Sequence, residues 1–288
     1  MSAEVIPIWD WHDDLLYSSG KNGSRKIAPC TANAITILRN DKAWAGLLAW
    51  DMLSQGIVCR KPPAWDTCDR PAPDPNDKSG AWRESDAIRL QAWLARHYAL
   101  YVSPRQAYEA ALICAEAARF DPIREYLERL TWDGVQRVDT WTHVHLGSPD
   151  DQYHRLVGRL LLIGSVARAM RPGCKLDTMP VLEGDQALKK STAIEALYSA
   201  QWTSDTPLEM GSKDRFVGLR GIWCHEMAEL DSFGKADANR IKTFLSSKVD
   251  DFRPPYAQTN VKVPRRAVMV GTVNPSALGY LRDLARLT

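Results

Sequence analysis

The sequence lacks long apolar segments and an N-terminal signal-peptide pattern. Its longest mainly apolar run, residues 156–170, is shorter than the roughly 20 residues that span a membrane, and it contains Arg159 and Arg168. Both a secretory signal and a membrane helix would need an uninterrupted apolar core. We therefore expect a soluble, cytoplasmic protein that has no membrane partner.

The six cysteines do not form a metal-binding pattern. None of them belongs to a Cys-x-x-Cys pair, and the closest two, Cys59 and Cys68, flank a proline-containing segment that suits a loop. No second pair of ligands follows them in the sequence. The spacing therefore gives no support to a structural zinc site.

The sequence also has no large excess of positive or negative residues, since the net charge is only +2. A polyanion would feel no long-range attraction to such a chain, so any contact with nucleic acid must be a local patch. With 45% hydrophobic and 25% charged residues, the composition is ordinary for a globular protein. A length of 288 residues is enough for two domains, each with its own core.

Proline and polar residues predict a chain of three parts. Residues 1–80 are expected to form a small α/β or irregular module that ends in a proline-rich linker. Residues 81–150 should form a helical subdomain, with helices over 85–96 and 103–118, because apolar residues recur there at helical spacing. This subdomain is either a winged-helix-like DNA module or a plain packing unit. Residues 151–288 are expected to form an α/β domain.

The most informative segment is residues 179–192, which read Met-Pro-Val-Leu-Glu-Gly-Asp-Gln-Ala-Leu-Lys-Lys-Ser-Thr. A short strand would end before Gly184, and a helix would begin at Lys190. The N-terminus of such a helix favours an anion through its free N–H groups and the helix dipole. In a loop of the form G-x-x-x-x-G-K-[ST], the lysine contacts nucleotide phosphates and the next hydroxyl binds Mg²⁺. The predicted nucleotide-binding residues are Gly184, Gln186, Lys189, Lys190, Ser191 and Thr192.

Lys189 stands where this loop pattern has glycine. Glycine allows a positive φ and a close approach of the backbone to phosphate, whereas lysine resists that geometry and adds a second cation. The alternative interpretation of the segment is an ordinary strand-to-helix turn with a basic helix start.

Two carboxylates follow a second apolar segment, at residues 221–231. The strand is expected to end at about His225 or Glu226, so that the following turn brings Glu229 back toward the loop. If this strand lies beside the loop strand, Glu226 would hold Mg²⁺ and Glu229 would activate the attacking water, and the reverse assignment stays open. The alternative is a pair of solvated carboxylates at a strand end.

A third apolar segment, residues 266–275, is expected to bring Asn274 to the same edge of the sheet. Its amide would contact the terminal phosphate or orient water, although an Asn-Pro pair after a strand is more commonly a plain turn. The order of the three segments predicts one site. The residues that would carry its chemistry are Lys190, Glu226, Glu229 and Asn274.

From Phe120 to about Asp283, a little over half its length, the chain resembles the virulence-associated protein E family. These are phage- and island-encoded P-loop ATPases akin to superfamily 3 helicases. The most specific matches are Leu130-Thr-Trp-Asp-Gly134 with Arg137 and Trp141, and Pro172-Gly-Cys-Lys-Leu-Asp177. Further matches are Leu182-Glu-Gly-Asp-Gln186, Lys190-Ser-Thr192, Glu226-Met-Ala-Glu-Leu-Asp231, Arg253-Pro-Pro-Tyr256, Val263-Pro-Arg-Arg266 and Gly271-Thr-Val-Asn274.

The resemblance implies an AAA+-like, superfamily 3 helicase-like ATPase core of the α/β class, preceded by a mainly helical region, with ATP and Mg²⁺ as cofactors. It also implies a ring-shaped homo-oligomer that moves along single-stranded DNA beside a primase or replication-initiation partner, in the cytoplasm of a bacterial host. In such helicases a hairpin before the asparagine strand tracks the DNA, which nominates Gln258, Asn260 and Lys262. With so few cations at the tip, a weakened DNA contact is the alternative.

Two features depart from the family. Relatives usually have glycine at the position of Ala187, whereas lysine at the position of Lys189 is a tolerated variant. Relatives also continue past the equivalent of Asp283 into a Gly-x-Arg-Arg-Phe-Trp-Pro-like segment, whose arginines would be trans-acting fingers or sensors. The chain ends at Thr288 without it, so the ATPase domain is expected to be C-terminally truncated and to hydrolyse ATP poorly.

Three functions from different classes follow. The first is an ATP-driven, helicase-like DNA replication protein of a phage or mobile element. The second is a nucleotide-binding regulatory or interaction protein with degenerate ATPase activity. A small-molecule kinase is disfavoured, because the sequence shows neither an acceptor-binding lid nor a second basic cluster.

Overall fold

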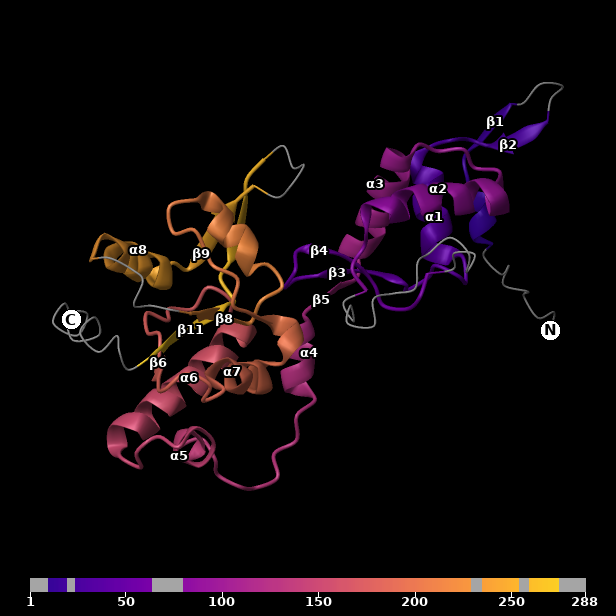
Figure 1. The fold of residues 1–288 in the computed structure, drawn as a ribbon. Helices are drawn as coiled ribbons and strands as arrows, with labels where there is room; N and C mark the ends of the chain where they lie inside the picture. Colours follow the sequence, from indigo (N-terminus) through magenta and orange to yellow (C-terminus); the bar gives the residue numbers. More distant parts are fainter. Residues whose placement is uncertain (1–9, 20–23, 64–79, 229–234, 254–258, 275–288) are drawn as a thin grey trace. The chain divides into compact units, whose positions relative to one another are not determined.

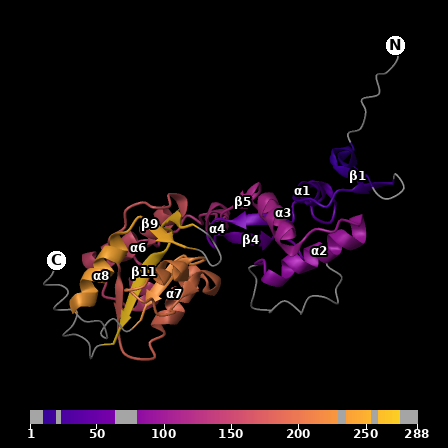
Figure 2. The ribbon, with the colours of Figure 1, turned by 90° about the horizontal axis from the view of Figure 1, so that it is seen from above.

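The computed structural model of the chain describes residues 10–19, 24–63, 80–228, 235–253 and 259–274. Contacts divide the chain into two compact units, Met1–Asp121 and Pro122–Thr288 (Figures 1 and 2). Both units combine helices with strands. The sequence predicted boundaries near residues 80 and 150, whereas the contacts divide the chain at residue 121.

The first unit combines three α-helices with short strands in its described part. Strand β3 pairs antiparallel with β4 and parallel with β5, and β1 and β2 form a separate antiparallel pair. The helices expected over 85–96 and 103–118 are confirmed as α2 and α3. The elements of this unit are η1 (Trp11–Asp14), β1 (Tyr17–Ser19), β2 (Arg25–Ile27), α1 (Thr31–Asn40), β3 (Leu48–Asp51), β4 (Gly56–Cys59), α2 (Glu84–Tyr98), α3 (Pro104–Glu116) and β5 (Arg119–Phe120).

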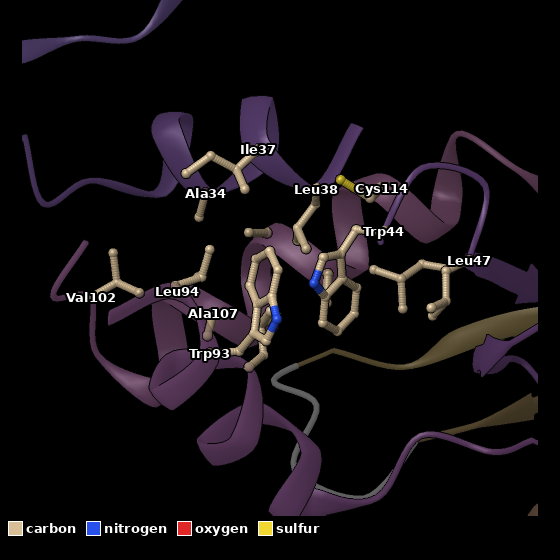
Figure 3. Close-up of a cluster of buried hydrophobic side chains, with 14 of the residues drawn as sticks. Ala34, Ile37, Leu38, Trp44, Leu47, Trp93, Leu94, Val102, Ala107 and Cys114 are labelled. Atoms are coloured by element: carbon tan, nitrogen blue, oxygen red, sulfur yellow. The ribbon is translucent and has the colours of Figure 1, made fainter. Parts of the chain in front are cut away.

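One hydrophobic core unites these helices. The rings of Trp44 and Trp93 meet edge to face with 5.5 Å between their centroids, and Leu38, Leu94 and Ala107 surround them (Figure 3). Edge-to-face aromatic pairs add to the gain from burial alone. Because this core takes side chains from both sides of residue 80, the segments before and after the predicted linker share one core.

The second unit is built on a parallel sheet. Its strand order is β6-β11-β8-β7, and each neighbouring pair is parallel. A separate antiparallel hairpin joins β9 and β10. The elements are α4 (Pro122–Glu128), α5 (Trp141–Leu146), α6 (Gln152–Met170), β6 (Val181–Glu183), α7 (Lys190–Tyr198), η3 (Ala200–Trp202), β7 (Thr203–Ser204), η4 (Lys213–Leu219), β8 (Cys224–Met227), α8 (Lys235–Ser246), β9 (Val249–Phe252), β10 (Val261–Pro264) and β11 (Val268–Val273).

Helices cover both faces of this sheet (Figure 1). Side chains alternate between the faces of a strand. Met227 of β8 and Met269 of β11 pack in a cluster with Phe244 of α8. Glu226, the residue before Met227, contacts Ser191 of α7 on the opposite face. The predicted α/β class is thus confirmed, together with a parallel sheet.

The strand order corrects one expectation from the sequence. The carboxylate strand β8 does not lie beside the loop strand β6, because β11 is inserted between them. Strand β8 also ends at Met227, one residue later than expected. After β6 the chain crosses to β7 at the far edge, and no local residue pattern encodes which later strand fills the gap.

A buried arginine anchors the base of the β9–β10 hairpin. Arg265 donates to Asp250 Oδ1 through Nε at 2.8 Å and through Nη2 at 2.6 Å, and it also donates to the carbonyl of Phe244 in α8. Burial raises the pKa of Asp250, while Arg265 opposes that rise. Such a pair fixes the geometry of the hairpin base, because breaking it would leave an unpaired buried charge.

His225 occupies the middle of the parallel sheet and is only 2% exposed. Its Nδ1 has no hydrogen-bond partner among the described residues. Burial lowers the pKa of His225 to about 4, an effect that Asp205 partly offsets. The folded protein therefore holds this ring neutral over a range in which an unfolded chain would protonate it.

We expect this histidine to make the second unit less stable in acid. Its stabilising effect is fully present above pH ~6.5 and is lost as the pH falls toward 4, because only the unfolded chain gains the proton in that window. The pKa difference corresponds to about 3 kcal/mol at most. Urea unfolding at several pH values measures it. His225→Gln should flatten the slope, and a variant with the slope of the wild type would contradict the assignment.

Candidate functional site

The loop between β6 and α7 contains two residues in the left-handed conformation. Ala187 has a φ of 71° and Lys189 a φ of 57°. This region costs a residue other than glycine roughly 1–2 kcal/mol, which explains why a phosphate-binding loop has glycine at such positions. The chain therefore adopts the backbone of a glycine loop while it carries alanine and lysine.

Lys190, the first residue of α7, reaches back over this loop. Its Nζ donates to the carbonyl oxygens of Gly184 at 2.6 Å and Asp185 at 3.0 Å, and to Asn274 Oδ1 at 3.2 Å. All three acceptors are uncharged, so these bonds orient the ammonium without neutralising it. The helix N-terminus behind it has no side-chain cap among the described residues. Both features favour an anion at this position.

Glu226 lies in the middle of the sheet with 3% of its surface exposed. Its Oε1 accepts hydrogen bonds from the Ser191 hydroxyl at 2.9 Å and from the Thr272 hydroxyl at 2.7 Å. A buried carboxylate needs such partners, because losing water without replacement is costly. Both hydroxyls bond the same oxygen, and Oε2 takes part in neither bond. The carboxylate is thus held by one oxygen beside the start of α7.

The structure therefore brings four predicted residues together at the carboxyl ends of neighbouring strands. Lys190 meets Asn274, and Ser191 meets Glu226, although 84 and 35 residues separate the partners in sequence. Gly184 lies in the loop beneath the lysine. The exposed residues Gln186, Lys189 and Thr192 lie in the same loop and in the first turn of α7.

Two predicted residues, Glu229 and Gln258, lie outside the described residues. The hairpin residues Asn260 and Lys262 are exposed, as a DNA contact would require. Asn260 donates to Asp251 Oδ1 at 3.1 Å, and Lys262 lies directly opposite Asp251 in the hairpin register. An acidic side chain therefore offsets the one cation that the sequence nominated here.

Sequence reasoning missed Thr272. It treated residues 266–275 as a strand that delivers Asn274, and it gave no role to the hydroxyl two residues earlier. A signal was present, because a buried polar side chain in an apolar strand almost always has a hydrogen-bond partner. Thr272 also lies two residues before Asn274, the spacing that places two side chains on one side of an extended chain. The partner was unpredictable without the strand order.

We expect Thr272→Val to lower the free energy of unfolding by about 1–3 kcal/mol, because Glu226 would lose a hydroxyl donor in a buried site. Thr272→Ser keeps the hydroxyl and should stay closer to the wild type. Denaturant unfolding of the two variants measures the difference. Equal stability of the valine variant and the wild type would show that the hydroxyl does not hold the carboxylate.

Within the described ranges, no group of three or more His, Cys, Asp or Glu side chains is arranged to hold a metal ion. None of the described helices has the length and apolar character of a membrane span. An ion at this site would need oxygen atoms from a ligand as well as from Ser191 and Glu226.

A family model described as the virulence-associated protein E-like domain matches residues 127–285. The match covers more than half of the chain, and it includes the loop, β8 and β11 with the four residues that meet there. No curated protein gives a match to the chain.

Proposed function

This chain belongs to the virulence-associated protein E-like family, and we propose that it is an ATP-binding, helicase-like DNA replication protein of a phage or mobile element. The observation that carries the proposal is the meeting of Lys190, Ser191, Glu226 and Asn274 at one edge of a parallel sheet. In open α/β sheets, ligands bind outside the carboxyl ends of the strands.

Each of these side chains has a chemical role in the proposal. Lys190 exchanges its bonds to the loop carbonyls for phosphate oxygens, and the free N–H groups of α7 add further donors. Ser191 and Glu226 would hold Mg²⁺, whose preference for hard oxygen ligands fits this donor set. A bound ion would supply charge neutralisation at the phosphates. Asn274 contacts the terminal phosphate, and Glu229 activates water.

Steady-state ATP hydrolysis, measured with and without single-stranded DNA, tests this function. If the protein is an ATP-driven, helicase-like enzyme, we expect a hydrolysis rate above background that DNA stimulates and that Lys190→Ala removes. A rate at background in both the wild type and the variant would contradict this function. A ring-shaped homo-oligomer and a primase or replication-initiation partner belong to the same proposal.

A second candidate function rests on the loop conformation. Ala187 and Lys189 both occupy left-handed positions where glycine would be unstrained. Their side chains raise the free-energy cost of this loop conformation and oppose a close approach of phosphate to the backbone. A nucleotide-binding regulatory protein with degenerate ATPase activity fits these features. It predicts ATP binding without turnover.

The hairpin gives a separate prediction about DNA. Lys262→Ala should weaken binding of single-stranded DNA and lower the salt dependence, as the slope of log K against log[salt], by roughly 0.7. Asp251→Asn should strengthen binding, because it removes the carboxylate opposite Lys262. Fluorescence anisotropy with a labelled thymidine oligonucleotide over a salt series measures both. If neither change alters the slope, this hairpin does not contact DNA.

A further inference from the structure

Three arginines act on the carboxylate of Asp250 at the base of the β9–β10 hairpin. Burial raises the pKa of Asp250, and the positive charges of Arg265, Arg168 and Arg215 oppose that rise. Among the described residues, Arg265 is the arginine that bonds this carboxylate directly. Asp250 can neutralise one guanidinium group. Positive charge therefore exceeds the negative charge that these described side chains supply.

Arg168 of α6 is buried without an ion-pair partner among the described residues. Its Nη1 donates to the carbonyl of Ala267 at 3.3 Å, and its Nη2 donates to that of Leu176 at 3.2 Å. The side chain is only 1% exposed, and its Nε has no hydrogen-bond partner in the part of the chain that the structure describes. Burial lowers the pKa of Arg168, Arg265 lowers it further, and the thiol of Cys174, which opposes both effects, is a weak acceptor.

A guanidinium group stays charged in a protein. Burying such a charge is costly unless a charge of opposite sign accompanies it. Bonds to two carbonyl oxygens orient the Arg168 side chain, but they do not neutralise it. The arrangement therefore calls for an anion beside Arg168.

A cavity of about 10 Å³ lies beside the two buried arginines. Arg168, Arg265 and Thr178 contribute its polar lining, and the end of α8 and the start of β11 contribute apolar lining. This volume is about the minimum that holds one particle of the size of a water molecule. The cavity lies at the opposite end of β11 from Asn274, away from the proposed nucleotide site.

We propose that this cavity binds one small monovalent anion, of the size class of chloride, in contact with Arg168 and Arg265. The anion accepts a hydrogen bond from Nε of Arg168 and neutralises the excess buried charge. A water molecule would accept the same bond but would leave the charge in place. Phosphate and sulfate carry four oxygens and need more room than one water-sized particle. The hydroxyl of Thr178 can donate to the anion as well.

The bound anion stabilises the base of the β9–β10 hairpin. Arg265 and Arg168 repel each other, as the lowered pKa of Arg168 indicates, and an anion beside both removes that repulsion. Arg265 also bonds Asp250 and the carbonyl of Phe244, so its position fixes the hairpin against α8. This inference does not rest on the proposed function, because none of the nucleotide-site residues lines the cavity.

The test is urea unfolding of the full chain, without nucleotide, in mixtures of sodium chloride and sodium gluconate at constant ionic strength. Gluconate is too large for the cavity. An anion that binds the folded chain alone raises the folding equilibrium constant by up to about tenfold for each tenfold rise in its concentration above Kd. We expect this chloride dependence in the wild type and its loss in Arg168→Gln, which keeps an amide donor but removes the charge.

Arg171→Gln is the matched control, because Arg171 is exposed just after α6 and the same charge is removed there. It should keep the chloride dependence of the wild type. If Arg168→Gln does not fold, the chlorine NMR linewidth of the folded wild type replaces it, and we expect a protein-dependent broadening that bromide reverses by competition. Equal stability of the wild type in chloride and gluconate, a chloride dependence retained in Arg168→Gln, or broadening that bromide does not affect would overturn the proposal.

Discussion

Lys190→Ala should abolish detectable ATP binding. Each charge-assisted contact between the ammonium and a phosphate oxygen is worth roughly 1.5–3 kcal/mol, so the loss of two such contacts weakens binding by about 100-fold or more. The ammonium is already oriented by the carbonyls of Gly184 and Asp185 and by Asn274. Calorimetric titration of ATP in the presence of Mg²⁺ measures the change. Affinity at the wild-type level in this variant would refute the assignment of Lys190.

Lys189→Gly is the control from the same loop. At a φ of 57° the lysine is strained, so glycine should relieve up to about 1–2 kcal/mol of backbone strain. Nucleotide binding should be equal or tighter, because the loop then reaches its shape at lower cost. A marked loss of affinity would show instead that the Lys189 side chain is itself a phosphate ligand. The two variants together separate the charge of the loop from its backbone geometry.

Glu226→Gln should remove the Mg²⁺ dependence of ATP binding while the fold stays intact. The amide oxygen can still accept from Ser191 and Thr272, so both hydrogen bonds at Oε1 are retained. A neutral amide is a poorer ligand for a hard cation. Changes to residues that only support a metal ligand already cost about 10–100-fold in affinity, and we expect at least the lower figure here.

The measurement for Glu226 is ATP affinity with Mg²⁺ and with EDTA. The variant should match the wild type in EDTA and fall behind it in Mg²⁺. Glu195→Gln is the control, because Glu195 is exposed on the same helix α7 and should leave both affinities unchanged. If Glu226→Gln responds to Mg²⁺ as the wild type does, the carboxylate has a structural role only, as the acceptor for two hydroxyls.

Local chemistry made much of this site predictable. Gly184 ends a short apolar strand, and Lys190 begins a helix, as the sequence predicted. Helices α2 and α3 also follow from apolar residues that recur at helical spacing within a short segment. The start of α3 has an equally local cause, since Ser103 and Gln106 form a capping box in front of Pro104.

The remaining features depend on contacts between distant residues. The position of β11 between β6 and β8 decides that Thr272, and not only Asn274, meets the carboxylate strand. The bonds of Lys190 to loop carbonyls depend on the left-handed conformation of Lys189. A lysine in the sequence does not predict that conformation. The core around Trp44 and Trp93 likewise joins segments that a proline-rich stretch separates in sequence. Tertiary packing therefore overrides the domain boundary that the proline-rich stretch predicted.

Hydrogen exchange on the full chain tests the central claim most directly, because it shows where ATP binds. Backbone amides that bond a phosphate exchange more slowly than amides that face water. With Mg²⁺ and ATP, we predict slowed exchange over residues 184–193 and at the end of β11, and no such change in Lys190→Ala. Unchanged exchange over 184–193, or protection confined to another part of the chain, would contradict a nucleotide site at this loop.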